Sequence, residues 1–189
     1  MFFDKQKLEQ SRAPELPAGD RYTIMIIDDK DANLAVMTAV LRPHYHLVEA
    51  RDGQEALTIL ERMAEREQLA CIISDQRMPG LSGVELLEKV HALLPHTTRI
   101  IVSGYIDVDA VVDSINKAEI HRFIAKPFDA HEFLSAVRRA VTQFERQRTA
   151  TVEHAAREQE VQQLSAALRA AEARIAQLEG SASPSRPSS

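Results

Sequence analysis

Five polar side chains of types that could transfer a phosphoryl group stand directly after apolar runs of the sequence. Asp28 and Asp29 follow TIMII, Asp75 follows CIIS, and Ser103 and Lys126 follow two later runs. Close carboxylates repel one another unless a cation joins them, and Mg²⁺ suits two or three carboxylates with room left for phosphate oxygens. One carboxylate could then attack phosphorus, while the ammonium neutralises the developing charge and the hydroxyl donates a hydrogen bond to the phosphoryl group.

The elements that must position these side chains alternate between short apolar runs and amphipathic stretches from Tyr22 to Phe144. Strict alternation predicts an α/β fold in which helices cover both faces of a parallel sheet. A TIM barrel would need eight such units, so we predict an open, doubly wound sheet of five strands. The predicted strands are 22–27, 46–50, 71–74, 99–102 and 122–125, and the predicted helices are 32–41, 54–66, 84–94, 108–118 and one beginning near residue 130.

Ligands of such sheets bind beyond the carboxyl ends of the strands, so the five polar side chains are predicted to share one edge. A single acidic residue in a loop could instead cap a helix, as Asp31 or Asp107 could. Five polar side chains that all follow strands favour a site. The sequence contains neither GxxxxGK[ST] nor GxGxxG, which argues against those phosphate-binding loops. The histidines and the lone Cys71 lack the spacing of a zinc site.

The ordered motifs resemble the receiver domain of two-component response regulators over about residues 20 to 143. They are the Asp-Asp pair at 28–29, SDQRMPG around Asp75, Ser-Gly at 103–104 and Lys-Pro-Phe at 126–128. The resemblance implies a flavodoxin-like sheet of order 2-1-3-4-5. It also implies a cis peptide bond between Lys126 and Pro127.

The resemblance further implies a role for each site residue. Asp75 would be the phosphoacceptor, and Mg²⁺ would be held by Asp28, Asp29, Asp75 and the backbone carbonyl of Arg77. Ser103 stands at the position of the switch hydroxyl, and Lys126 at that of the lysine that contacts the phosphoryl group. Phe123 matches the aromatic switch position; the alternative is an ordinary core aromatic.

As a receiver, the chain would accept a phosphoryl group from a sensor histidine kinase or a phosphotransfer protein. It would catalyse its own phosphorylation and dephosphorylation without a stand-alone catalytic domain, and Arg77 and Tyr105 would influence the lifetime of the phosphoryl group. The segment 103–129 is most similar to receivers of cyclic-di-GMP phosphodiesterases or NtrC-type regulators. The chain could therefore be the sensory half of a truncated cyclic-di-GMP or transcriptional regulator, joined to an effector domain or acting through a partner protein. The remaining alternative is a phosphoryl sink or shuttle in a phosphorelay.

A long helix is predicted after the receiver, because residues 145–179 contain neither Gly nor Pro. Apolar residues spaced three and four apart make a heptad seam, which predicts a parallel homodimer through a coiled coil at 161–178, although a single solvated helix would also fit. The predicted organisation is a flexible leader at 1–20, a receiver at 21–144, a coiled-coil helix at 145–179 and a disordered tail at 180–189. Phosphorylation would then act by rearranging the receiver and the coiled-coil dimer.

Composition sets the remaining expectations. The 189 residues carry a net charge of −5 without a basic stripe, so we expect no direct contact with nucleic acid. The apolar runs are too short to span a bilayer, so we expect no membrane contact. A single cysteine fits the reducing cytoplasm, where we expect the protein to reside.

Overall fold

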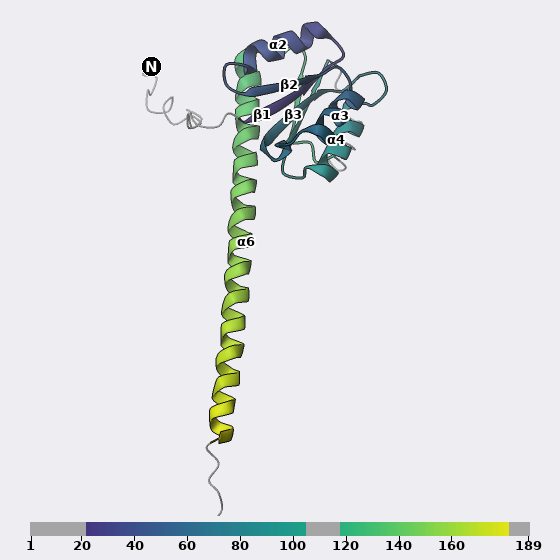
Figure 1. Ribbon diagram of the computed structural model, residues 1–189. Coiled ribbons are helices and arrows are strands. Elements are labelled where there is room, and N and C mark those ends of the chain that lie inside the picture. Colours follow the sequence, from purple (N-terminus) through teal and green to yellow (C-terminus); the bar gives the residue numbers. More distant parts are fainter. Residues whose placement is uncertain (1–21, 105–117, 182–189) are drawn as a thin grey trace, which may run out of the picture. The chain divides into compact units, whose positions relative to one another are not determined.

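The computed structural model describes residues 22–104 and 118–181, with side chains as far as Arg174. Five parallel strands form one sheet in the order β2-β1-β3-β4-β5 (Figure 1). The strands are β1 (Thr23–Ile27), β2 (His46–Ala50), β3 (Leu69–Asp75), β4 (Thr98–Ser103) and β5 (Arg122–Ala125). The predicted fold and strand order are therefore confirmed, with every strand end within two residues of its predicted place.

Within the described residues three helices connect these strands, and two of them, α3 and α4, begin at capping side chains. They are α2 (Asp31–Leu41), α3 (Gly53–Arg62) and α4 (Gly83–Leu93). The Asp52 side chain caps α3 by accepting from the backbone N–H of Glu55 at 2.8 Å, and Ser82 with Glu85 forms a reciprocal capping box at the start of α4. The predicted helix 108–118 lies, apart from Ala118, outside the described residues.

The prediction that α3 extends to residue 66 is wrong. The helix ends at Arg62 because Met63 adopts extended backbone, with φ −70° and ψ 115°. A short 3₁₀ turn, η1 (Arg66–Gln68), then leads into β3, which begins two residues earlier than predicted. The good helix formers at 63–68 therefore serve as the connection that returns the chain to the sheet.

Alternate residues of the central strands pack into two apolar layers, one on each face of the sheet. Ile24 and Ile26 lie in one layer with α2 and the first turns of α6 (Ala130–Ser181). Met25 and Ile27 lie in the other layer with α3 and α4, which are side by side in Figure 1. This two-residue period explains why a strand buried on both faces is apolar throughout.

Helix α6 confirms the predicted uninterrupted helix over 145–179 and continues to Ser181, two residues further. The chain divides into two compact units, one as far as Gln147 and one from Arg148. In the first unit Phe144 is the last residue of α6 in the core, whereas the side chains from Arg148 to Arg174 are all exposed. Gly180 and Ser181, which were predicted to begin the disordered tail 180–189, instead continue α6; the rest of that tail and the predicted leader 1–20 lie outside the described residues. No helix in the described part of the chain is long and apolar enough to cross a membrane.

Candidate functional site

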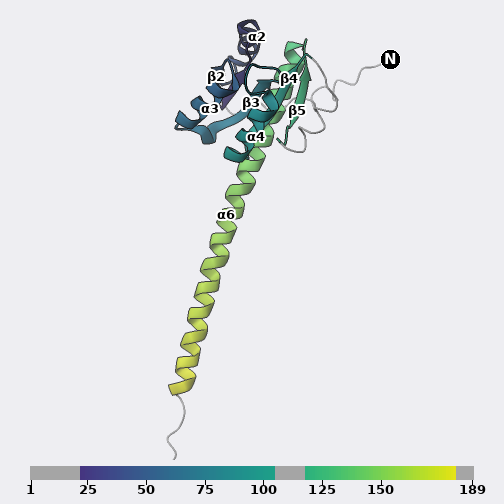
Figure 2. The ribbon, with the colours of Figure 1, turned by 90° about the vertical axis from the view of Figure 1, so that its right-hand side faces the viewer.

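Four of the predicted site residues stand at the carboxyl ends of neighbouring strands, as the sequence predicts. Asp28 follows β1, Asp75 ends β3, Ser103 ends β4 and Lys126 follows β5. The parallel register places Asp75 opposite Val102, and Ser103 opposite Ala125. Figure 2 shows β4 and β5 side by side at one edge of the sheet. One strand edge thus gathers groups that lie far apart in the sequence.

The Lys126 ammonium joins two of the carboxylates. Its Nζ donates to Asp28 Oδ2 at 2.6 Å and also to Asp75 Oδ1. The side chains of Lys126, Asp75 and Asp28 are 18%, 12% and 1% exposed, so water screens these contacts weakly. Burial disfavours the charged amine, but its hydrogen bonds to Asp28 and Asp75, together with their charges, outweigh burial and raise the pKa of Lys126.

Asp28 is held in place by a residue that the sequence analysis missed. Asn33, in the first turns of α2, donates from Nδ2 to both oxygens of Asp28, at 2.9 and 3.0 Å. The backbone N–H of Lys30 donates to Asp28 Oδ1 at 3.0 Å. Asp29, by contrast, is exposed. A polar residue five positions after an acidic strand end was the available signal for Asn33.

Asp75 is fixed by its own backbone surroundings. The N–H of Arg77 donates to Asp75 Oδ2 at 2.6 Å, which orients the carboxylate from the side opposite the lysine contact. Behind it, Gly83 at the start of α4 approaches so closely that an added Cβ would lie 2.3 Å from the Asp75 carbonyl oxygen. Gly83 was also missed, because only the packing of α4 on β3 makes a glycine necessary there.

Ser103 and Phe123, the two residues of the predicted switch, lie on the adjacent strands β4 and β5. The Ser103 residue is 8% exposed, and its backbone carbonyl accepts from the Lys126 N–H at 2.8 Å. Phe123 is half-buried against the layer that contains Met25 and Ile101. The peptide bond before Pro127 is cis, as the resemblance implies.

The residues present fit a hard cation, although a complete set of metal ligands is not assembled. Among the described residues, no three Asp, Glu, His or Cys side chains are placed together to hold a metal ion. Two carboxylates, however, already converge on one positively charged atom, Lys126 Nζ. Asp29 adjoins Asp28 with its side chain exposed. Carboxylate oxygens, two or three of them in one site, are ligands that Mg²⁺ prefers.

Comparison with known proteins shows one family. The model of the response regulator receiver domain matches residues 24–138. The hydrogenase transcriptional regulatory protein HoxA of Cupriavidus necator is 32% identical over 119 residues, which are 63% of this chain and 24% of HoxA. Sporulation initiation phosphotransferase F of Bacillus subtilis is 29% identical over 61% of this chain and 90% of its own length.

Solved structures agree with these sequence relatives. The signal receiver domain of an HD domain-containing protein from Pseudomonas fluorescens is 32% identical, with a TM-score of 0.62 over 67% of this chain and 98% of that domain. A CheY-like receiver from Methanospirillum hungatei is 28% identical, with a TM-score of 0.63 over 68% of this chain and 99% of that one. The chain spans about a quarter of the length of HoxA, whereas it spans these isolated receivers almost completely. The chain therefore belongs to the family of response regulator receiver domains of two-component systems.

Proposed function

We propose that Asp75 is the phosphoacceptor of this receiver domain. The single observation that carries the proposal is the Lys126 ammonium, which holds the carboxylates of Asp28 and Asp75 together at the carboxyl edge of the sheet. The donor would be the phosphohistidine of a sensor histidine kinase or a phosphotransfer protein. An oxygen of Asp75 forms the new bond to phosphorus, the bond from phosphorus to the imidazole nitrogen breaks, and the imidazole leaves with that electron pair.

The surrounding residues have separate parts in this transfer. Mg²⁺ would be held by Asp28, Asp29, Asp75 and the Arg77 carbonyl, and when bound it supplies positive charge to the phosphoryl oxygens. Lys126 neutralises charge on the transferred group from a position already within hydrogen-bonding distance of Asp75. The exposed side chain of Asp29 would turn towards Asp28 to complete the set of ligands.

Ser103 and Phe123 would carry the signal away from the site. Ser103 would hydrogen-bond to the phosphoryl group, and Phe123 would move into the space that Ser103 leaves. Two positions support this role. Ser103 and Phe123 lie on the adjacent strands β4 and β5, and the backbone carbonyl of Ser103 accepts a hydrogen bond from the Lys126 N–H. The negative charge added by phosphorylation would thus favour one of two arrangements of the β4 and β5 ends over the other.

The second unit supports a role for a second copy of this chain. Val161, Leu164 and Leu168 are 62%, 64% and 61% exposed although their side chains are apolar, and they lie on one face of α6 at heptad spacing. Pairing of two such helices over 161–178 as a parallel coiled coil would bury this seam. We therefore propose a cytoplasmic homodimer whose arrangement responds to phosphorylation.

Light scattering and phosphorylation together test these assignments. Wild-type protein with Mg²⁺ and acetyl phosphate should acquire one phosphoryl group, and Asp75→Asn should acquire none. Beryllofluoride with Mg²⁺ should mimic this state and change the hydrodynamic radius of the dimer. A chain that is monomeric at every concentration would exclude the coiled-coil dimer while leaving the assignment of Asp75 intact.

The alternative functions differ in the lifetime of the phosphoryl group. A sink or shuttle needs rapid turnover of the phosphoryl group, whereas a switch needs a lifetime of minutes or more. HoxA and FixJ are named as transcriptional regulatory proteins and are longer than the segment that matches, so an effector domain or effector partner is also compatible with this receiver. Measuring the decay of phosphorylated Asp75 separates the switch from the shuttle.

A further inference from the structure

A completely buried cation lies at the amino ends of the strands, whereas the site lies at their carboxyl ends. Arg99, the second residue of β4, has a side chain that is 0% exposed. Its carboxylate partner, Glu119, is 65% exposed and lies 3.5 Å from Nη2. Burying a charge is costly unless it is well compensated, and one distant, hydrated carboxylate compensates little. Burial accordingly lowers the pKa of Arg99, against the opposing effect of Glu119.

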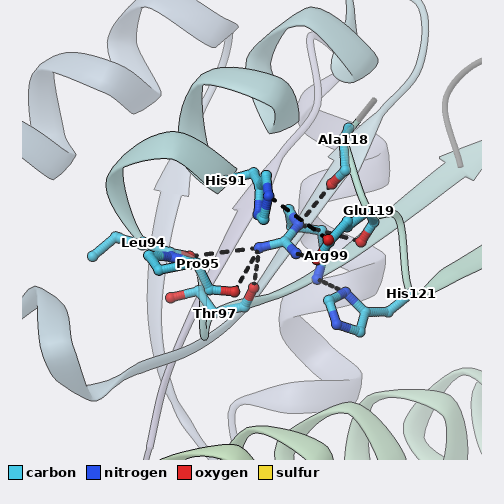
Figure 3. Close-up of polar contacts among 8 residues, drawn as sticks. All are labelled: His91, Leu94, Pro95, Thr97, Arg99, Ala118, Glu119 and His121. Atoms are coloured by element: carbon cyan, nitrogen blue, oxygen red, sulfur yellow. Dashed lines mark hydrogen bonds and ion pairs between the residues drawn. The ribbon is translucent and has the colours of Figure 1, made fainter. Parts of the chain in front are cut away.

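Backbone carbonyls provide most of the compensation. Arg99 Nη1 donates to the carbonyl oxygen of Thr97 at 2.7 Å, and more weakly to those of Pro95 and Leu94, at 3.3 and 3.5 Å. On the other side, Nε donates to the carbonyl oxygens of Ala118 at 2.8 Å and Glu119 at 3.3 Å. Figure 3 shows the guanidinium between these two stretches of backbone. We call Arg99 and these five carbonyl groups the Arg99 clamp.

The clamp acts on the residues that lead directly into β5. His121 donates its backbone N–H to the Arg99 carbonyl at 2.9 Å, and His121 Nδ1 accepts from the Arg99 N–H at 3.1 Å. Glu119 has φ 44°, a backbone conformation that residues other than Gly rarely adopt. The clamp bonds the carbonyls on both sides of that φ angle, at Ala118 and Glu119, and so over-determines the strained turn.

Strand β5 is the shortest of the five described strands, so few backbone hydrogen bonds hold its register. It has four residues, lies at the edge of the sheet and pairs only with β4. The residue that follows it is Lys126, whose ammonium must reach both Asp28 and Asp75. Any slip of β5 along β4 therefore moves the ammonium away from the carboxylates.

We propose that Arg99 is a positioning residue for phosphoryl transfer, which sets the place of Lys126 by clamping the start of β5. This proposal rests on the proposed role of Asp75 and Lys126. The clamp acts from one end of the strand on chemistry at the other end, because the guanidinium hydrogen-bonds to both stretches of backbone, at Thr97 and at Ala118.

The test compares Arg99→Lys and Arg99→Gln with two matched controls in the full-length chain. Lysine keeps the buried charge but cannot span both stretches of carbonyls. Arg122→Gln removes an exposed arginine from β5 itself, and Glu119→Gln removes the weak ion pairs of Glu119 with Arg99 and His91 but leaves its backbone carbonyl in place. The readouts are the rate of phosphorylation by acetyl phosphate and hydrogen exchange at the Lys126 amide, which bonds to Ser103, and at the Met25 amide in β1.

We expect Arg99→Lys to lower the phosphorylation rate about 10- to 100-fold, because displacements near 1 Å have effects of that size on positioned groups. Exchange at Lys126 should accelerate at least tenfold more than exchange at Met25, whereas both controls should behave as wild type. Equal acceleration at both amides, with a wild-type rate in the folded fraction, would show a structural role only and overturn the proposal. If Arg99→Gln does not fold, Arg99→Lys carries the test alone.

The two hypotheses fail in different ways. A wild-type chain that takes up no phosphoryl group would refute the role of Asp75, and the exchange data would still report on the clamp. Unchanged protection of Lys126 in Arg99→Lys would refute the clamp while leaving phosphorylation of Asp75 in place.

Discussion

The close approach of Gly83 to Asp75 gives the sharpest prediction about the site. In Gly83→Ala, the new Cβ would lie 2.3 Å from the Asp75 carbonyl oxygen and 2.9 Å from Ile101 Cδ1. Ordinary contacts begin near 3.4 Å, so about 1 Å of separation must be found. The closer obstacle is the backbone of a central strand, which cannot rotate away as a side-chain end can. The start of α4 must therefore move relative to the end of β3.

The expected cost has two parts. Overpacking at a buried position costs about 3 kcal/mol of unfolding free energy, which the small gain in helix propensity at the first turn does not offset. Displacing Asp75 relative to Lys126 should also lower the phosphorylation rate about 10- to 100-fold. Urea titration measures the first effect, and incubation with acetyl phosphate and Mg²⁺, followed by intact mass, measures the second.

Gly53→Ala is the matched control. Gly53 is also buried at the first position of a helix, but its added Cβ would meet the Leu81 side chain at 2.8 Å rather than strand backbone. It should lose stability but keep a phosphorylation rate within about threefold of wild type. If Gly83→Ala is as stable and as reactive as wild type, the packing argument for Asp75 is wrong.

Three further predictions concern the site, the pH dependence and the long helix. Lys126→Met should lower the free energy of unfolding by about 2 kcal/mol in urea titrations without divalent ions, because Asp28 and Asp75 lose their shared cation. Mg²⁺ should recover part of that loss, and an unchanged midpoint would contradict the bridging role. Burial, reinforced by the charge of Arg99, lowers the pKa of His121 from 6.5 to about 4, so the unfolded state binds a proton first. The contribution of His121 to the free energy of unfolding should be complete above about pH 6.5 and fall by about 1 kcal/mol between pH 7 and 5, a value kept small because His121 is partly exposed. A His121→Asn chain with the same pH slope would contradict this. Leu168→Asp should shift sedimentation towards the monomer without changing the phosphorylation rate, and a dimer that persists unchanged would exclude the seam.

Much of the fold was predictable because local patterns report it directly. Within TIMII and CIIS, residues 24–27 and 71–73 are apolar without interruption, which is typical of strands covered on both faces, and both runs lie in the central strands. The placing of Asp28, Asp75, Ser103 and Lys126 at one edge followed from the parallel order of those strands. The end of α3 was not predictable, because residues 63–68 favour helix locally and yield to the path of the chain into β3.

The residues that the sequence did not reveal are those whose role depends on tertiary contacts. Asn33 is a common polar residue in a helix until Asp28 is placed beside it. Gly83 reads as a helix start until α4 packs on the Asp75 carbonyl. Arg99 was assigned to the first position of a strand, where an arginine is ordinarily exposed, and its complete burial becomes visible only when the loops on either side are folded around it.

The central claim is that Asp75 accepts the phosphoryl group with the help of Lys126 and Mg²⁺. Its most direct test is the intact mass and peptide map of the chain after incubation with acetyl phosphate and Mg²⁺, beside Asp75→Asn and a sample containing a chelator. We expect one added phosphoryl group on the wild-type peptide that contains Asp75, and none in the other two samples. A phosphoryl group on the Asp75→Asn chain, or equal labelling of the wild type with the chelator present, would contradict it.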